Sequence, residues 1–144
     1  MSVQVRAEAP VNPTEDEEKV QKALLNIFPD AKVEKKGSRL DGLVKLSLNG
    51  AGLDFLSTFR SLIRQERIRS VARRLMMSRT EGERVVIYLH KQAAFVGRVS
   101  FCEPVGESPL GPISIEITSS TPETVIDYLA AMPGQDGFQR FRET

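Results

Sequence analysis

Residues 113–117 read Ile-Ser-Ile-Glu-Ile, and their pattern is typical of a β-strand. Apolar and polar side chains alternate along this run, as they do in a β-strand with one buried and one exposed face. The chain is therefore expected to build a sheet with one apolar face. The same alternation predicts further strands, whose apolar positions are Val3 and Val5; Val33; Val44, Leu46 and Leu48; Val85, Ile87 and Leu89; and Phe95, Val99 and Phe101.

Helical spacing of apolar residues marks the segments between these strands. Thr14 and Glu17 have the spacing of a capping box, which predicts a first helix that begins there and ends before Pro29. Residues 53–75 carry two helical patterns, which belong either to one kinked helix or to two short ones. Pro122 suits the first position of a final helix.

The resulting order, β-α-β-β-α(α)-β-β-β-α, indicates an α+β fold. Short connections favour antiparallel neighbours, and 144 residues suffice for one hydrophobic core. We expect a single two-layer domain over residues 1–131, with a mostly antiparallel sheet covered on one face by helices, and a C-terminal tail at 132–144. The uncovered face is expected to carry Gln4, Arg6, Lys45, Ser47, Tyr88, His90, Arg98, Ser114, Glu116 and Thr118.

Two residue counts exclude several kinds of site. Cys102 is the only cysteine, so no internal disulfide and no multi-thiolate zinc or iron–sulfur site can form. His90 is the only histidine, which excludes metal sites with two or three histidines from one chain. No G-x-S-x-G elbow is present, and the glycines of residues 49–52 lack the spacing of a phosphate-binding loop. We expect no catalytic residue, no metal and no cofactor.

The distribution of apolar residues bears on location. Residues 1–10 contain charged side chains and no apolar run, and no segment approaches about 18 uninterrupted apolar residues. A chain with one cysteine suits a reducing compartment. We expect a cytoplasmic protein that is neither secreted nor membrane-spanning.

Charge is unevenly distributed, although the net charge is only +1. Residues 60–79 contain seven arginines against the single acid Glu66, a formal charge of +6, whereas residues 8–18 contain five acids and no base. Guanidinium groups match two phosphate oxygens at once, so the segment is a candidate RNA-binding surface, although a solvated helix face explains such a run equally well. The arginine ridge, as we name these seven residues, consists of Arg60, Arg64, Arg67, Arg69, Arg73, Arg74 and Arg79.

A second group of candidate RNA-binding residues lies around position 90. Stacking and hydrogen-bonding side chains are mixed there, as on sheets that hold single-stranded RNA. Aromatic residues make up only 6% of the chain and no RNP-type run is present, so an ordinary polar sheet face is the alternative. The candidates are Tyr88, His90, Lys91, Gln92 and Arg98.

Several strings of residues are distinctive. They are Val11-Asn12-Pro13-Thr14-Glu15-Asp16, Ile27-Phe28-Pro29-Asp30-Ala31, Arg64-Gln65-Glu66-Arg67-Ile68 with Ala72-Arg73, Leu89-His90-Lys91-Gln92-Ala93-Ala94-Phe95-Val96-Gly97 and Ser108-Pro109-Leu110-Gly111-Pro112-Ile113. Together they resemble the archaeal UPF0201 family, an uncharacterised family often described as predicted RNA-binding proteins or predicted exosome subunits. The resemblance covers the chain from about Val3 to Leu129. It implies a fold similar to that of the ribosomal protein that binds 5S ribosomal RNA.

Two hypotheses about function follow. The first is a non-catalytic RNA-binding module that acts in RNA processing or in ribosome- or exosome-related assembly through the arginine ridge. The alternative is a protein-interaction or homodimeric assembly subunit without direct nucleic-acid binding, because the acidic and basic segments could pair between chains. A small-molecule enzyme ranks last, since no catalytic constellation is present.

Overall fold

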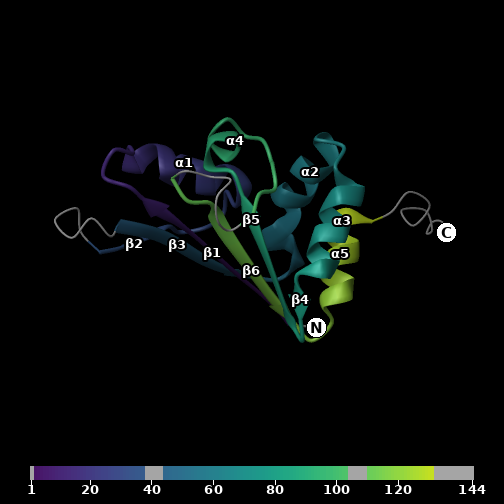
Figure 1. Ribbon diagram of the computed structural model, residues 1–144. Helices are drawn as coiled ribbons and strands as arrows, with labels where there is room; N and C mark the ends of the chain where they lie inside the picture. Colours follow the sequence, from purple (N-terminus) through teal and green to yellow (C-terminus); the bar gives the residue numbers. More distant parts are fainter. Residues whose placement is uncertain (1, 38–43, 104–109, 132–144) are drawn as a thin grey trace.

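The computed structural model describes residues 2–37, 44–103 and 110–131 (Figure 1). Its six antiparallel strands form one sheet in the order β2-β3-β1-β6-β5-β4, which confirms the α+β class. The strands are β1 (Val3–Val11), β2 (Glu34–Lys36), β3 (Val44–Ala51), β4 (Thr80–Glu81), β5 (Arg84–Leu89) and β6 (Ile113–Ser119). The expected tail at 132–144 lies outside the described residues.

All the helices lie on one side of this sheet (Figure 1). Helices α1 and α4 pack together over one end, and α2, α3 and α5 pack together over the other. The opposite face of the sheet is left uncovered, as the sequence predicts. The helices are α1 (Glu17–Ile27), a 3-10 turn η1 (Leu53–Leu56), α2 (Ser57–Gln65), α3 (Arg69–Ser78), α4 (Lys91–Phe95) and α5 (Pro122–Ala130).

Alternation along the strands determines which face is covered. In β6, Ile113, Ile115 and Ile117 are buried, whereas the polar residues between them are half-buried. Each fully buried isoleucine or phenylalanine contributes about 1.5 to 3 kcal/mol to stability. A strand with this pattern is therefore held with its isoleucines toward the helices, and a register slip of one residue would turn them all outward.

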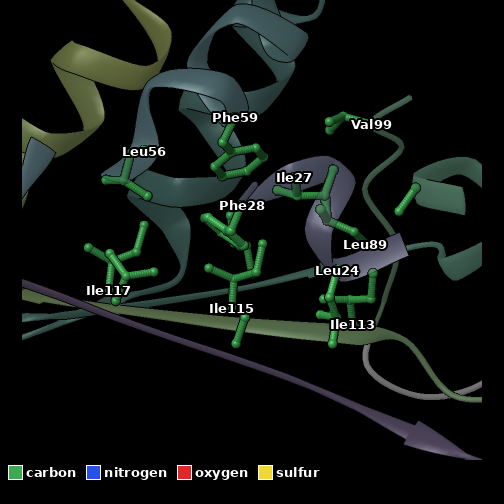
Figure 2. Close-up of a cluster of buried hydrophobic side chains, with 14 of the residues drawn as sticks. Leu24, Ile27, Phe28, Leu56, Phe59, Leu89, Val99, Ile113, Ile115 and Ile117 are labelled. Carbon is green, nitrogen blue, oxygen red and sulfur yellow. The ribbon is translucent and has the colours of Figure 1, made fainter. Parts of the chain in front are cut away.

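Aromatic side chains fill the space between the sheet and helices α1 and α2. Figure 2 shows Ile115 of β6 below Phe28, with Phe59 above that ring, while Ile117 lies below Leu56 and Ile113 beside Leu24. The ring of Phe28 stacks on Phe55 with centroids 5.3 Å apart and meets Phe59 at 6.0 Å. Gly50 leaves room for this stack, because a Cβ atom at that position would overlap the Phe55 ring. Gly50 itself lies within β3, which continues to Ala51.

One predicted strand is wrong. The segment with Phe95, Val99 and Phe101 forms helix α4 and then a loop, which touches the sheet only through an isolated bridge between Leu89 and Phe101. An unpredicted short strand, β4, supplies the edge of the sheet instead. His90 and Arg98 therefore do not lie on the open face of the sheet: His90 precedes α4 as its N-cap, and Arg98 follows α4.

The first helix begins later than the sequence predicts. Its N-cap is Asp16, whose carboxylate accepts a hydrogen bond from Glu18 N at 2.9 Å, and not Thr14. Glu15, just before this N-cap, accepts hydrogen bonds from the backbone and the side chain of Asn12. The end before Pro29 and the last helix, with Pro122 in its first turn, are as predicted.

The uncovered sheet face carries charges that largely pair with one another. Glu8 lies 3.5 Å from both Arg6 and Lys45, and Arg84 lies 3.1 Å from Glu116. Strand register places the predicted residues together on this face, with Gln4 opposite Thr118, Arg6 opposite Glu116, and Ser114 beside Tyr88.

None of the helices in the described part of the chain has the length and the apolar character that a membrane span requires.

Candidate nucleic-acid interface

Helices α2 and α3 are separate helices joined by a tight corner at residues 66–68. Ile68 N donates to Ile63 O at 3.4 Å, and Arg67 N donates to Arg64 O at 3.1 Å. This pair of hydrogen bonds is the Schellman motif, which ends a helix with one residue in the left-handed conformation. Here that residue is Arg67, with φ of 59°. The corner divides the arginine ridge into parts that point in different directions.

Three arginines of the ridge are exposed and unengaged. The side chains of Arg64, Arg67 and Arg74 make no hydrogen bond or ion pair with any residue that the structure describes. Arg74 shares the exposed side of α3 with Val71 and Met77, which are 41% and 47% exposed, because residues three apart lie on the same side of a helix. These three guanidinium groups are free to bind a ligand.

A fourth arginine reaches the corner from a different part of the chain. Arg98 donates two parallel hydrogen bonds to Glu66, from Nε at 3.0 Å and from Nη2 at 2.9 Å. The bonds hold the pKa of the Glu66 carboxyl below its usual value. The Arg98 side chain is still 68% exposed, whereas that of Glu66 is 13% exposed. We name Arg64, Glu66, Arg67 and Arg98 the basic corner; three arginines and one glutamate give it a net charge of +2.

Two other ridge arginines face inward and stabilise helix α5. Arg60 Nε donates to Tyr128 O at 2.9 Å, and its guanidinium lies 4.9 Å from the Tyr128 ring centroid. Arg73 pairs with Asp127 at 2.6 Å and reaches Ala130 O at 3.5 Å. The last carbonyl groups of a helix have no partner within the helix, so both arginines satisfy the C-terminal end of α5. The fold uses these two residues.

The ridge ends at a second, separate cluster. Arg79 follows α3 and pairs with Glu103 at 2.6 Å, and its guanidinium lies 5.5 Å from the Tyr88 ring centroid. Arg79, Tyr88 and Arg84 line a hollow of about 310 Å³ beside the sheet. Helix α3 separates this cluster from the basic corner by about 15 Å, given 10 residues and a rise of about 1.5 Å per residue. Arg69, in the first turn of α3, is half-buried.

Lys91 is buried and fully engaged. Its ammonium group donates to Pro10 O, Leu110 O and Glu15 Oε1, each at 2.8 Å. Burial lowers the pKa of Lys91, and the carboxylate of Glu15 partly offsets this effect. All three N–H groups of the ammonium therefore donate to groups within the fold, so Lys91 is not available to bind a ligand.

The remaining sheet candidates do not meet at the basic corner. Gln92 is exposed and lines a hollow of about 490 Å³ between α1 and α4, together with Lys19 and Phe95. His90 is half-buried, and its backbone N–H bonds to Ser100 O at 2.9 Å. The structure therefore brings only Arg98 of this group to the basic corner, whereas Tyr88 lies beside Arg79 at the other end of the ridge.

Sequence reasoning missed the roles of Asn12 and Glu15. Asn12 Nδ2 donates to Glu15 Oε1 at 3.0 Å and to Leu110 O at 2.6 Å, and Glu15 holds Lys91. These residues come from three of the distinctive strings, those that contain residues 11–16, 89–97 and 108–113. The distinctive strings mark these residues, but the sequence does not show that the three strings meet at the ammonium group of Lys91.

Comparisons with known proteins identify the family. A family model described as RNA binding matches residues 4–121. A UPF0201 protein of Aeropyrum pernix is 43% identical over 143 residues, covering 96% of this chain and 93% of that protein. The chain belongs to the UPF0201 family. A UPF0201 protein of Metallosphaera sedula is 39% identical over 124 residues, covering 85% of this chain and 83% of that protein.

Solved structures agree with this UPF0201 assignment. The crystal structure of a UPF0201 protein from Methanococcus jannaschii is similar with a TM-score of 0.79 and 29% identity, over 90% of this chain and 93% of that one. A second UPF0201 crystal structure has a TM-score of 0.73 and 34% identity, over 90% and 94%. The resemblance drawn from the sequence strings is confirmed. RNA binding is the description of the family model, and the names of these UPF0201 relatives specify no process.

Proposed function

We propose that this protein is a non-catalytic RNA-binding module whose contact surface is the basic corner together with Arg74. The observation that carries the proposal is the exposure of Arg64, Arg67 and Arg74 without a partner in the described part of the chain. The family model described as RNA binding supports the same class of ligand. Arg98 joins the surface through its bridge to Glu66.

The chemistry of these groups suits the RNA backbone. A guanidinium presents several N–H donors in a planar fork that fits two phosphate oxygens, and it stays charged at all physiological pH values. Each phosphate that is neutralised releases condensed counterions, which supplies most of the affinity in binding without sequence preference. Val71 and Met77, on the exposed side of α3, offer apolar contact beside Arg74. The surface is expected to bind with little sequence preference.

The cellular role follows from the family resemblance. A module of this kind in an archaeal family described as predicted exosome subunits would act in RNA processing, or in ribosome- or exosome-related assembly. We expect it to do so in the cytoplasm. No small-molecule cofactor is needed for such a role.

Salt-dependent binding tests the proposal. Labelled mixed-sequence RNA and duplex DNA are titrated with the protein at about 50 and about 200 mM salt, where phosphate-driven affinity changes steeply. The double variant Arg64→Ala with Arg74→Ala should bind all RNA sequences more weakly and flatten the slope of log K against log salt by about 1.4, at about 0.7 per phosphate.

Arg84→Ala is the matched control, because Arg84 is exposed and pairs with Glu116 on the sheet face. It should leave the salt slope unchanged. If the double variant binds as the wild type does, the surface is wrong. If the wild type binds no RNA at the lower salt, the function is wrong, and a salt-sensitive dimer in light scattering would then identify an assembly subunit.

A further inference from the structure

Arg67 occupies a backbone conformation that side chains avoid. Its φ of 59° is the only positive φ among the non-glycine residues that the structure describes. The position after the last residue of a helix in a Schellman motif is usually glycine, which adopts this conformation without a clash between Cβ and the backbone. On grounds of stability alone, the α2–α3 corner would therefore carry glycine.

The Arg67 side chain makes no contact that stabilises the described part of the fold. It is exposed, and it makes no hydrogen bond or ion pair with the described residues. Its backbone N–H makes the hydrogen bond of the motif, and glycine would make the same bond. The one structural benefit is a positive charge beside the C-terminal end of α2, where the helix dipole is negative. Lysine would supply that charge equally well.

The surroundings of Arg67 point to a ligand with negative charge. Arg64 lies three residues before it on the last turn of α2, and Arg98 is held at the same corner by its two hydrogen bonds to Glu66. Two hydrogen bonds hold the backbone of the corner, from Arg67 N and Ile68 N to carbonyl groups of α2. Residues in disfavoured conformations are retained where the surrounding structure holds them and function uses them.

We propose that Arg67 is retained in this conformation because its guanidinium binds a phosphodiester group of RNA, together with Arg64 and Arg98 of the basic corner. The inference rests on the proposed function and adds to it the residue at the centre of the contact. If the inference is right, removing the Arg67 side chain should keep or raise the stability of the protein and weaken its binding of RNA. Removal of a residue that serves only the fold would lower the stability instead.

The variant Arg67→Gly tests this inference. We expect its thermal unfolding temperature to be equal to or higher than that of the wild type, because glycine relieves the disfavoured φ. Loss of one phosphate contact should weaken RNA binding roughly eightfold at about 50 mM salt and roughly threefold at about 200 mM salt, given a salt exponent of about 0.7 per phosphate.

Two further variants exclude simpler explanations. Arg67→Lys keeps the charge at the end of α2 and the backbone conformation, so its stability should match the wild type, while the loss of the planar fork should weaken RNA binding. Arg67→Gln removes the charge but keeps a side chain at positive φ, so it should lose affinity as Arg67→Gly does, without the gain in stability.

The outcomes separate the two proposals. If the wild type binds RNA and Arg67→Gly binds it with the same affinity and salt slope, the inference is wrong and the proposed function stands. If Arg67→Gly unfolds at a lower temperature than the wild type, Arg67 serves the fold and the inference is also wrong. If the wild type binds no RNA at about 50 mM salt, the proposed function fails and the inference falls with it.

Discussion

The ammonium of Lys91 lies 2.8 Å from Oε1 of Glu15, 76 residues away in the sequence, and their side chains are only 4% and 12% exposed. The same ammonium donates to the backbone of Pro10 and of Leu110. It therefore ties together the end of β1, the loop before α1, the start of α4 and the approach to β6. A single buried charge holds four segments of the chain.

Lys91→Met should destabilise the protein strongly. The change removes the cation paired with Glu15 and the ammonium donor to the carbonyl groups of Pro10 and Leu110, of which Leu110 O keeps its hydrogen bond from Asn12 Nδ2. Breaking a buried pair costs about 3 to 5 kcal/mol. Urea unfolding followed by circular dichroism measures the loss. Lys19→Met is the control, because Lys19 is exposed and lines, like Lys91, the hollow between α1 and α4. Equal midpoints for the Lys91 variant and the wild type would show that the pair does not stabilise the fold.

Acid should remove the contribution of Glu15. Burial raises the pKa of this carboxyl, but hydrogen bonds from Asn12 and Lys91 outweigh it and hold the pKa below the usual 4.5. Since the folded-state pKa is lowered, the pair stabilises the protein above pH 4.5, and this stability is lost as the pH falls through the folded-state value. Unfolding free energies measured between about pH 7 and about pH 3 should therefore converge for the wild type and Glu15→Gln. A constant difference across this range would contradict the assignment.

Neighbouring arginines on α3 should behave differently when replaced. Arg73→Ala removes hydrogen bonds to Asp127 and to the end of α5, so it should cost about 1 to 2 kcal/mol of stability. Arg74→Ala should change stability by less than about 0.5 kcal/mol, because its side chain is exposed and unengaged. RNA binding should show the reverse order, with the salt slope lowered only in Arg74→Ala. Thermal unfolding and RNA titration of both variants check this separation.

Gly50→Ala should destabilise the aromatic stack. The added methyl group would overlap the ring of Phe55, which stacks on Phe28, and overpacking of this kind costs about 1 to 3 kcal/mol. A smaller side chain at position 55 should relieve the overlap. The double variant Gly50→Ala with Phe55→Leu is therefore expected to lose less than the sum of the two single variants in urea unfolding. Additive losses would show that the two residues do not interact.

Regular alternation and helical spacing explain which elements were predictable. Val85, Ile87 and Leu89 lie on a strand because each packs on the same face of the sheet, and nothing outside the segment is needed to make that pattern. The strand prediction for the segment from Phe95 to Phe101 is wrong because its three apolar positions are too few to distinguish a strand from a short helix. Its conformation depends on packing of α4 against α1, which lies about 70 residues earlier in the chain.

The same distinction holds for the candidate site. The α+β class, the excess of arginine in residues 60–79 and the family can be predicted from the amino-acid sequence, because they depend on local pattern and composition. Which arginines are exposed without a partner depends on how the chain folds. Arg60 and Arg73 bond to α5, whereas Arg98, which follows α4 in the chain, pairs with Glu66 at the basic corner. These partners are separated by 32 to 68 residues along the chain, so only folding brings them within hydrogen-bond reach.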